Sequence, residues 1–206
     1  MCDRLWASDD TAVEEDTVSH LWGPLAALAG EWAGEVGVDV AFSHSRGETH
    51  STAYREVCSM KPFGPVDNGT QSLYGLDYRS AMWRDDEENP FHTEVGYWLW
   101  DAATDEVVKG FVVPRGITTL AGGTASGDAT GWTMHAELGH ATYAIGENRY
   151  LSAHASSLSY DCTITVTDDG WSYDQTTMLR MDQFAEPFAH TDKHTLHRTA
   201  AAVFPV

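Results

Sequence analysis

The densest group of side chains that could do chemistry is a histidine cluster near the end of the chain, FAHTDKHTLHR. If this segment is a strand, His190, His194 and Leu196 share one face. Neutral imidazole is the commonest metal ligand in proteins, and Asp192 could orient one imidazole by accepting its second N–H. The cluster fits a metal or cofactor site as well as it fits a polar surface strand, and the residues alone leave both interpretations open.

A second candidate lies in ENPFHTEVGYWLW, where His92 stands at the start of an aromatic-rich strand. Strand alternation places His92 and Glu94 on one face, opposite a more apolar face that contains Val95 and Tyr97. That apolar face could be the core face, which would leave His92 near solvent. Gly96 marks a place where backbone or ligand can approach closely. Taken alone, the stretch favours an ordinary residue at a strand edge.

Other candidates are weaker. In WTMHAELGH, His135 and His140 are five residues apart on one expected strand, so they fall on opposite faces and do not suit a shared metal. Arg115, in the corner VVPRG, is either a solvated charge or an anion clamp. The chain contains no G-x-S-x-G, no H-E-x-x-H and no phosphate-binding loop.

Composition limits the class of protein. The 206 residues suffice for one domain, and we expect residues 1–17 to be a flexible acidic segment and residues 18–206 a single domain. A net charge of −19 opposes binding to nucleic acid or to an anionic membrane. Three cysteines without CxxC spacing suit a reducing compartment. The acidic start is unlike a signal peptide and no apolar run is long enough to span a membrane, which predicts a cytoplasmic protein.

The elements that must position these side chains are mostly strands. A short helix is expected over residues 16–29, limited by Pro24 to two short turns. Turns are expected at DNG (67–69), AGG (121–123), SGD (126–128) and DDG (168–170), the last within a hairpin. The predicted strands are 31–43, 49–61, 70–83, 93–100, 106–113, 118–121, 132–144, 156–166, 171–181 and 195–202.

Together these patterns predict an all-β fold: an up-and-down antiparallel β-barrel of about ten strands with a short N-terminal helix. Alternation is only partial on most strands, since small and polar residues occur on both faces. A barrel that encloses a cavity has this property, because its inner wall can be partly polar.

The order of several motifs resembles one family. LAGEWAG, PFHTEVGYW, VVPRGITTLAGG, the WSYDQTTMLRM hairpin and the histidine-rich tail occur in the order found in nitrobindins, which are heme-binding β-barrels. The resemblance covers roughly residues 20–200, and P-x-H-x-E-x-G-Y is its most specific piece. It implies a ten-stranded barrel that holds ferric heme b through one histidine of the last strand, binds nitric oxide and isomerises peroxynitrite to nitrate.

Carried over residue by residue, the resemblance implies His190 as the axial ligand of the heme iron, with His194 as the second choice. It implies that His92 lies beside the heme as the catalytic residue and does not coordinate the iron. The remaining cofactor-binding residues that it implies are Phe91, Val113, Thr177 and Trp32. Trp32 also has a purely structural interpretation, as a plug that closes one end of the barrel.

The chain departs from the family pattern in its first strand. The family signature G-x-W-x-G-x-G matches at Gly30, Trp32 and Gly34, but its last glycine comes one residue late, at Gly37. VDVAFS stands where the family has Tyr-Pro-Thr. We expect the protein to be a monomer or a homodimer. An alternative function is a non-enzymatic carrier that holds a fatty acid or another hydrophobic small molecule without heme. A third is a non-heme metal site of His190, His194 and Asp192.

Overall fold

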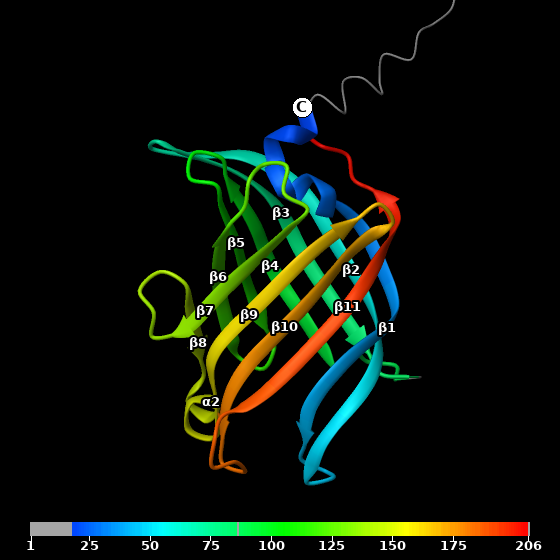
Figure 1. Cartoon of the computed structure of the whole chain (residues 1–206), viewed down its shortest axis with the longest axis vertical. Helices are drawn as coiled ribbons and strands as arrows, with labels where there is room; N and C mark the ends of the chain where they lie inside the picture. The colour runs from blue at the N-terminus through cyan, green and yellow to red at the C-terminus, as the bar shows by residue number, and fades with distance from the viewer. Residues whose placement is uncertain (1–17, 86, 206) are drawn as a thin grey trace, which may run out of the picture.

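The described residues of the chain fold into a closed barrel of eleven strands (Figure 1). The computed structural model describes residues 18–85 and 87–205, so the expected flexible segment 1–17 lies outside the described residues. The strands are β1 Gly30–Ser43, β2 Glu48–Asn68, β3 Gln71–Trp83, β4 His92–Asp101, β5 Glu106–Val113, β6 Ile117–Thr124, β7 Gly131–Leu138, β8 Ala144–Glu147, β9 Ala155–Thr167, β10 Gly170–Met181 and β11 Phe188–Ala201. β1 pairs with both β2 and β11, which closes the barrel. The all-β barrel expected from the sequence is confirmed.

Among the strands of the described residues, all pairings but one are antiparallel. β7 and β8 pair in parallel, so the barrel is mixed. The single strand expected over residues 132–144 is wrong, because β7 ends at Leu138 and the chain turns before β8. Gly139 has a φ of +80°, and the Nδ1 atom of His140 accepts hydrogen bonds from the backbone N–H groups of Thr142 and Tyr143. His140 therefore shapes a turn.

Two further strands, β6 and β11, differ from the expected bounds. AGG at 121–123 lies inside β6 and is not a turn. A Cβ at Gly123 would overlap the carbonyl oxygen of Thr133, so this glycine allows two strands to approach closely. The last strand begins at Phe188, which places the whole histidine cluster on β11.

A short 3₁₀ helix, η1 (His20–Leu28), covers one end of the barrel (Figure 1). Gly23 has non-helical backbone angles and Pro24 follows it, so the segment forms two short turns, as expected. Trp22 is fully buried and its indole N–H donates to the Gly75 carbonyl oxygen at 2.9 Å. None of the helices in the described part of the chain has the length and apolar character needed to cross a membrane.

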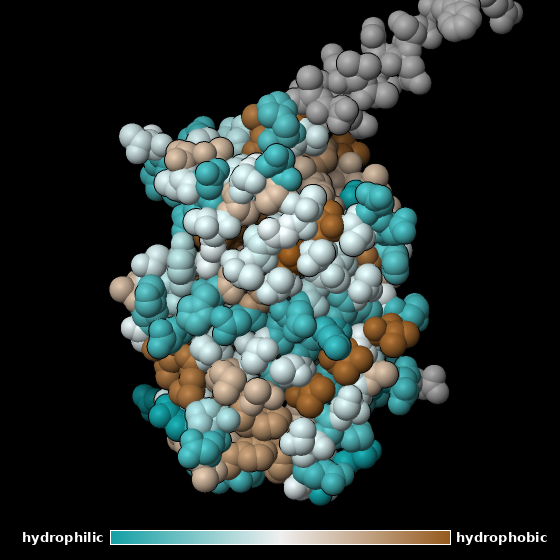
Figure 2. Space-filling model, viewed as in Figure 1, coloured by the Kyte–Doolittle hydropathy of each residue, from teal (hydrophilic) through white to brown (hydrophobic). Residues whose placement is uncertain are grey.

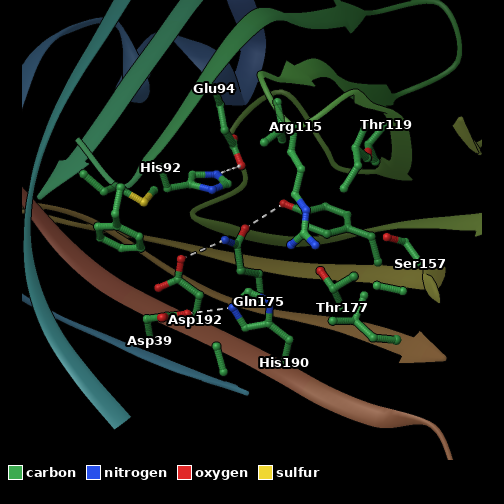
Figure 3. A pocket seen from close by; sticks show the side chains of 18 of the residues that line it. Asp39, His92, Glu94, Arg115, Thr119, Ser157, Gln175, Thr177, His190 and Asp192 are labelled. Carbon is green, nitrogen blue, oxygen red and sulfur yellow. Dashed lines mark hydrogen bonds and ion pairs between the residues drawn. The ribbon is translucent and has the colours of Figure 1, made fainter. Parts of the chain in front are cut away.

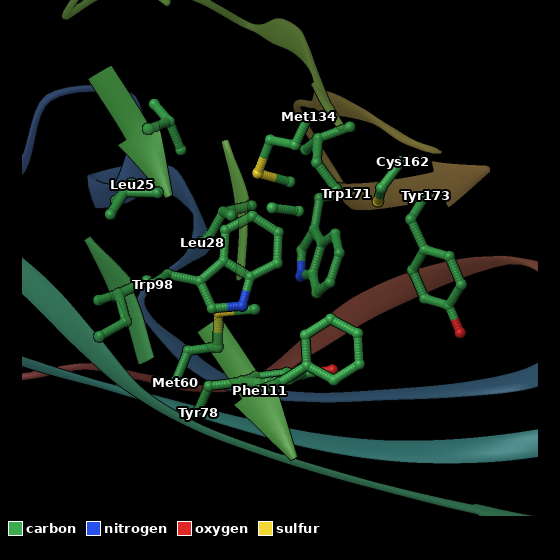
Figure 4. Close-up of a cluster of buried hydrophobic side chains, with 14 of the residues drawn as sticks. Leu25, Leu28, Met60, Tyr78, Trp98, Phe111, Met134, Cys162, Trp171 and Tyr173 are labelled. Atoms are coloured by element: carbon green, nitrogen blue, oxygen red, sulfur yellow. The ribbon is translucent and has the colours of Figure 1, made fainter. Parts of the chain in front are cut away.

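The apolar core fills the half of the barrel next to η1 (Figure 4). Trp32 lies there, 1% exposed, with its ring centroid 6.3 Å from that of Trp171 and the Arg198 guanidinium 4.4 Å from its own ring centroid. Trp98, Met60 and other large side chains complete this core. Packing of this kind suits the structural interpretation of Trp32.

The opposite end is closed in part by the helix α2 (Arg149–His154), which the sequence patterns did not predict. The side chain of Asn148 caps it by accepting a hydrogen bond from the Leu151 N–H at 3.0 Å. Leu151 is buried in a small second cluster with Ala155 and Met181. On the face drawn in Figure 2, apolar side chains show among hydrophilic ones at this lower end of the molecule.

A bulge in β1 accounts for the late glycine of the family signature. The pairing of β1 with β2 shifts between Gly34 and Gly37, and the two residues between them are exposed. The extra residue restores the alternation, so both glycines are buried on the inner side of the wall. Gly37 therefore occupies an inward position despite its changed spacing.

Candidate functional site

A cavity of about 460 Å³ lies inside the end of the barrel opposite η1 (Figure 3). This volume is within the range of pockets that hold small molecules and cofactors. Part of its wall is apolar and part is polar. The apolar part includes Phe111, Val113, Ile117, Ile145, Leu151, Leu179 and Met181; the polar part includes Asp39, Arg84, His92, Glu94, Tyr160, Gln175, His190 and Asp192.

The inner face of β4 carries the first set of polar groups. His92, Glu94 and Trp98 point into the barrel, whereas Val95 and Tyr97 are 43% and 55% exposed on the outside. The expectation that Val95 and Tyr97 form the core face is therefore wrong. The alternation of polar and apolar residues gave the wrong inner face because the barrel buries the charged residue Glu94 on its inner side. On its outer side, the apolar residues Val95 and Val112 are register partners on adjacent strands.

Glu94 is buried and neutralised by Lys109, whose Nζ lies 2.9 Å from its carboxylate. The Tyr78 hydroxyl donates to the same carboxylate at 2.8 Å, and His92 Nε2 lies 3.3 Å from it. Burial alone would raise the pKa of Glu94, but the Lys109 ammonium and His92 lower it to about 2. Burial alone would lower the pKa of His92, but the hydrogen bond to Glu94 and its negative charge raise it overall.

Lys109 is itself enclosed by aromatic rings. Its ammonium lies 4.3 Å from the ring centroid of Phe111 and within 5.6 Å of the centroids of Tyr78, Trp98 and Tyr160. Cation–π attraction and the Glu94 carboxylate together compensate for the loss of water around a buried ammonium. This cation therefore lies behind the cavity wall, where it contacts the lining residues Glu94 and Tyr160, and it is not a free base.

From Lys109 a chain of hydrogen bonds reaches the cavity and crosses its floor, which is formed by Tyr160, Gln175 and Asp192. Lys109 donates to the Tyr160 hydroxyl at 3.2 Å, Tyr160 donates to Gln175 at 2.8 Å, and Gln175 donates to Asp192 at 3.1 Å. The Tyr54 hydroxyl donates to the other oxygen of Asp192. Burial raises the pKa of Asp192 to about 6. The floor thus offers both donors and acceptors to a polar ligand.

His190 lies on β11 and faces the cavity beside Thr177, its register partner on β10. Its Nε2 lies 2.6 Å from the Oδ1 atom of Asp39, and its side chain is 35% exposed. Within the described residues the Nδ1 atom has no hydrogen-bond partner. A histidine held at one nitrogen by a carboxylate, with its other nitrogen available, is a common arrangement for a metal ligand.

His194 faces inward too, but it does not line the cavity. Its ring lies against Gly34 and Gly37, where a Cβ on either glycine would overlap it. Its Nδ1–H donates to the Thr195 carbonyl oxygen at 2.8 Å, and its Nε2 is buried without a hydrogen-bond partner among the described residues. Burial lowers its pKa. The bulge in β1 thus encloses His194 in the barrel wall.

The implied site residues separate into two groups. Phe91, His92, Val113, Thr177 and His190 all line the cavity, as does Arg115, whose role the sequence left open. Trp32 and His194 do not. In the described part of the chain no group of three or more His, Cys, Asp or Glu residues is arranged to hold a metal ion, so His190, Asp192 and His194 form no such site.

The sequence reasoning missed Asp39, Arg84, Lys109, Gln175 and the floor network. A usable signal existed, because Glu56 lies two residues from Tyr54, and Lys109 lies two residues from Phe111, on the same strand face. Charged residues at inward positions indicate a polar interior, although they do not reveal which residues pair.

The barrel and its partly polar cavity define a small-molecule-binding β-barrel. The chain belongs to the THAP4-like, heme-binding beta-barrel domain family, whose profile matches residues 22–198; this is the nitrobindin family expected from the sequence. The crystal structure of Rv2717c from M. tuberculosis is similar over 87% of this chain and 97% of that chain, with a TM-score of 0.60 and 20% identity, a likeness that shows the fold. A comparison with curated protein sequences gives no match.

The residues of the cavity fit a heme. His190 supplies one imidazole with a free nitrogen, and Asp39 lies behind that imidazole. The apolar wall suits the faces of a porphyrin. Arg84 and Arg115, both partly exposed and both lining the cavity, suit its two carboxylates.

Proposed function

We propose that this barrel binds ferric heme b in its cavity, with His190 as the axial ligand, and that it acts on peroxynitrite or nitric oxide. The observation that carries the proposal is the single cavity-lining imidazole on β11, with one nitrogen bound to Asp39 and the other free. The family match supplies the cofactor class. When bound, the heme supplies an iron that can take up a small anion or nitric oxide.

The chain's own residues would position the cofactor and the ligand. His92 is held by Glu94, its pKa is raised, and it lines the cavity as a hydrogen-bond donor for an anionic ligand. Phe91, Val113 and Thr177 would limit the space beside it. The net charge of −19 would slow the approach of an anion such as peroxynitrite. We expect modest turnover for that reason.

The proposal includes a cytoplasmic location. Cys58 and Cys162 are buried free thiols, which suits a reducing compartment. Burial raises the pKa of the Cys58 thiol and raises that of Cys162 to about 11, so both are unreactive.

Titration with hemin tests the axial ligand. The Soret band should form with the unchanged chain, weaken strongly in His190→Ala and persist in His194→Ala. Loss of the band in His194→Ala, or no loss in His190→Ala, would show that the axial assignment is wrong. Stopped-flow decay of peroxynitrite, with nitrate measured as the product, tests the activity. A rate no higher than that of free hemin would reduce the function to binding.

A second candidate is a carrier of a hydrophobic small molecule without heme. The apolar wall formed by Ile117, Ile145, Leu151, Leu179 and Met181 favours it. Native mass spectrometry of the purified chain distinguishes the two functions, because an iron porphyrin and a lipid differ in mass and only the porphyrin absorbs visible light.

A further inference from the structure

The carboxylate of Asp39 is the closest polar partner of the His190 ring, 2.6 Å from Nε2. We propose that Asp39 is a positioning residue that fixes the tautomer and orientation of the axial imidazole and so stabilises the ferric state of a bound heme. This inference rests on the proposed function. It names a residue that the sequence motifs did not indicate, in the segment VDVAFS where the chain departs from the family pattern.

The backbone of Asp39 is fixed from both sides. Its register partners are Thr52 on β2 and Asp192 on β11, so its Cα is paired with a strand on each side. Its side chain is only 6% exposed. A short carboxylate side chain on a doubly paired strand has little freedom to move away from His190.

The second oxygen of Asp39 faces a cation. The Nη2 atom of Arg84 lies 3.9 Å from Oδ2, and the guanidinium lies over the ring of Phe91, 4.0 Å from its centroid. Arg84 lies beside Oδ2, and Oδ1 is directed at His190 (Figure 3). Arg84, Asp39 and His190 form one connected series on the cavity wall.

The hydrogen bond determines which nitrogen is available. Since a carboxylate can only accept a hydrogen bond, the proton of the neutral imidazole lies on Nε2, and this N–H donates a hydrogen bond to Asp39. The lone pair of the ring is then on Nδ1. An imidazole that donates to a carboxylate is a more basic ligand than one that donates to a backbone carbonyl. A more basic ligand stabilises the higher charge of ferric iron and lowers the reduction potential.

His194 provides the contrast within the same strand. It donates from Nδ1 to a backbone carbonyl, and its remaining nitrogen is enclosed by the bulge of β1. Two inward histidines on β11 therefore differ in both partner and access, and only His190 has a carboxylate behind it.

The test uses the chain reconstituted with hemin, compared with Asp39→Asn and Asp39→Glu. Asp39→Asn should still form a Soret band, but its hemin dissociation constant should rise by about 10- to 100-fold, the usual effect of losing such a partner. Its reduction potential should become more positive, and the iron–imidazole stretching band of the reduced protein should move to lower frequency. Asp39→Glu should restore part of each change.

Asp192→Asn is the matched control, because in the described part of the chain this carboxylate lines the same cavity but makes no hydrogen bond to His190. Equal potential shifts in Asp39→Asn and Asp192→Asn would mean a general charge effect and would overturn the inference. So would an unchanged potential and stretching band in Asp39→Asn. If His190→Ala also leaves hemin binding unchanged, the proposed function itself fails, and that outcome is distinguishable from failure of the Asp39 role alone. Circular dichroism verifies that each variant is folded.

Discussion

The hydroxyl oxygens of Tyr54 and Tyr173 lie 2.8 Å apart, and each hydroxyl also contacts a buried carboxyl group. Tyr173 contacts Glu56 at 2.7 Å, and Tyr54 contacts Asp192. These four groups form a row with three hydrogen bonds, which require three protons. The two tyrosines supply only two, so one carboxyl group must supply the third.

Glu56 is the better holder of that proton. It is 2% exposed, and burial raises its pKa to about 7, against about 6 for Asp192. We predict that infrared spectra near pH 6 show the carbonyl band of a protonated carboxylic acid, which loses most of its intensity in Glu56→Gln and fades as the pH rises through about 7. Glu94→Gln is the control, because Lys109 keeps that carboxyl ionised. A band of undiminished intensity in Glu56→Gln would assign the proton elsewhere.

The same proton makes stability depend on pH. The pKa of Glu56 rises from 4.5 to about 7 on folding, so the native state binds more protons between these values and the free energy of unfolding falls as the pH rises. The loss should reach about 3 kcal/mol by pH 7. Urea unfolding from pH 4.5 to 7.5 should show this decline in the unchanged chain and a flatter profile in Glu56→Gln. Parallel profiles for the two chains would contradict it.

The barrel itself was predictable from the sequence. Turn residues at DNG and DDG mark real hairpins, β2–β3 and β9–β10, and Pro24 correctly limited the leading helix. These signals are local, since they depend on the backbone preferences of a few adjacent residues. Five of the seven site residues implied by the family resemblance line the cavity, and the order of the motifs along the chain was enough to identify them.

The rest depends on contacts between distant strands. The inward direction of His92 follows from a charge pair between Glu94 on β4 and Lys109 on β5, which no local pattern reveals. The separation of His190 from His194 follows from a bulge of one extra residue in β1, although both histidines have the same parity on β11. Local alternation cannot detect an irregularity on a neighbouring strand.

The ion pair of Glu94 and Lys109 yields a third prediction. Lys109→Met leaves the Glu94 carboxylate buried and without its cation, which should cost about 3–5 kcal/mol of stability. Lys109→Met combined with Glu94→Gln should regain much of that loss, because no unpaired charge remains. Urea unfolding of the two single variants and the double variant gives the coupling energy. Simple addition of the two single losses would show that the pair is not coupled.

The glycines of the β1 bulge yield the last prediction. A Cβ at Gly37 would overlap the rings of both His194 and Tyr54, so Gly37→Ala should lower stability by about 1–3 kcal/mol through overpacking. Gly127→Ala is the matched control, because its Cβ would meet no atom closer than 3.9 Å, and it should change stability by less than about 0.5 kcal/mol. Thermal unfolding measures both. Since His194 lies outside the cavity, hemin affinity should fall much less in Gly37→Ala than in His190→Ala; an equal fall would mean that the wall around His194 also holds the cofactor.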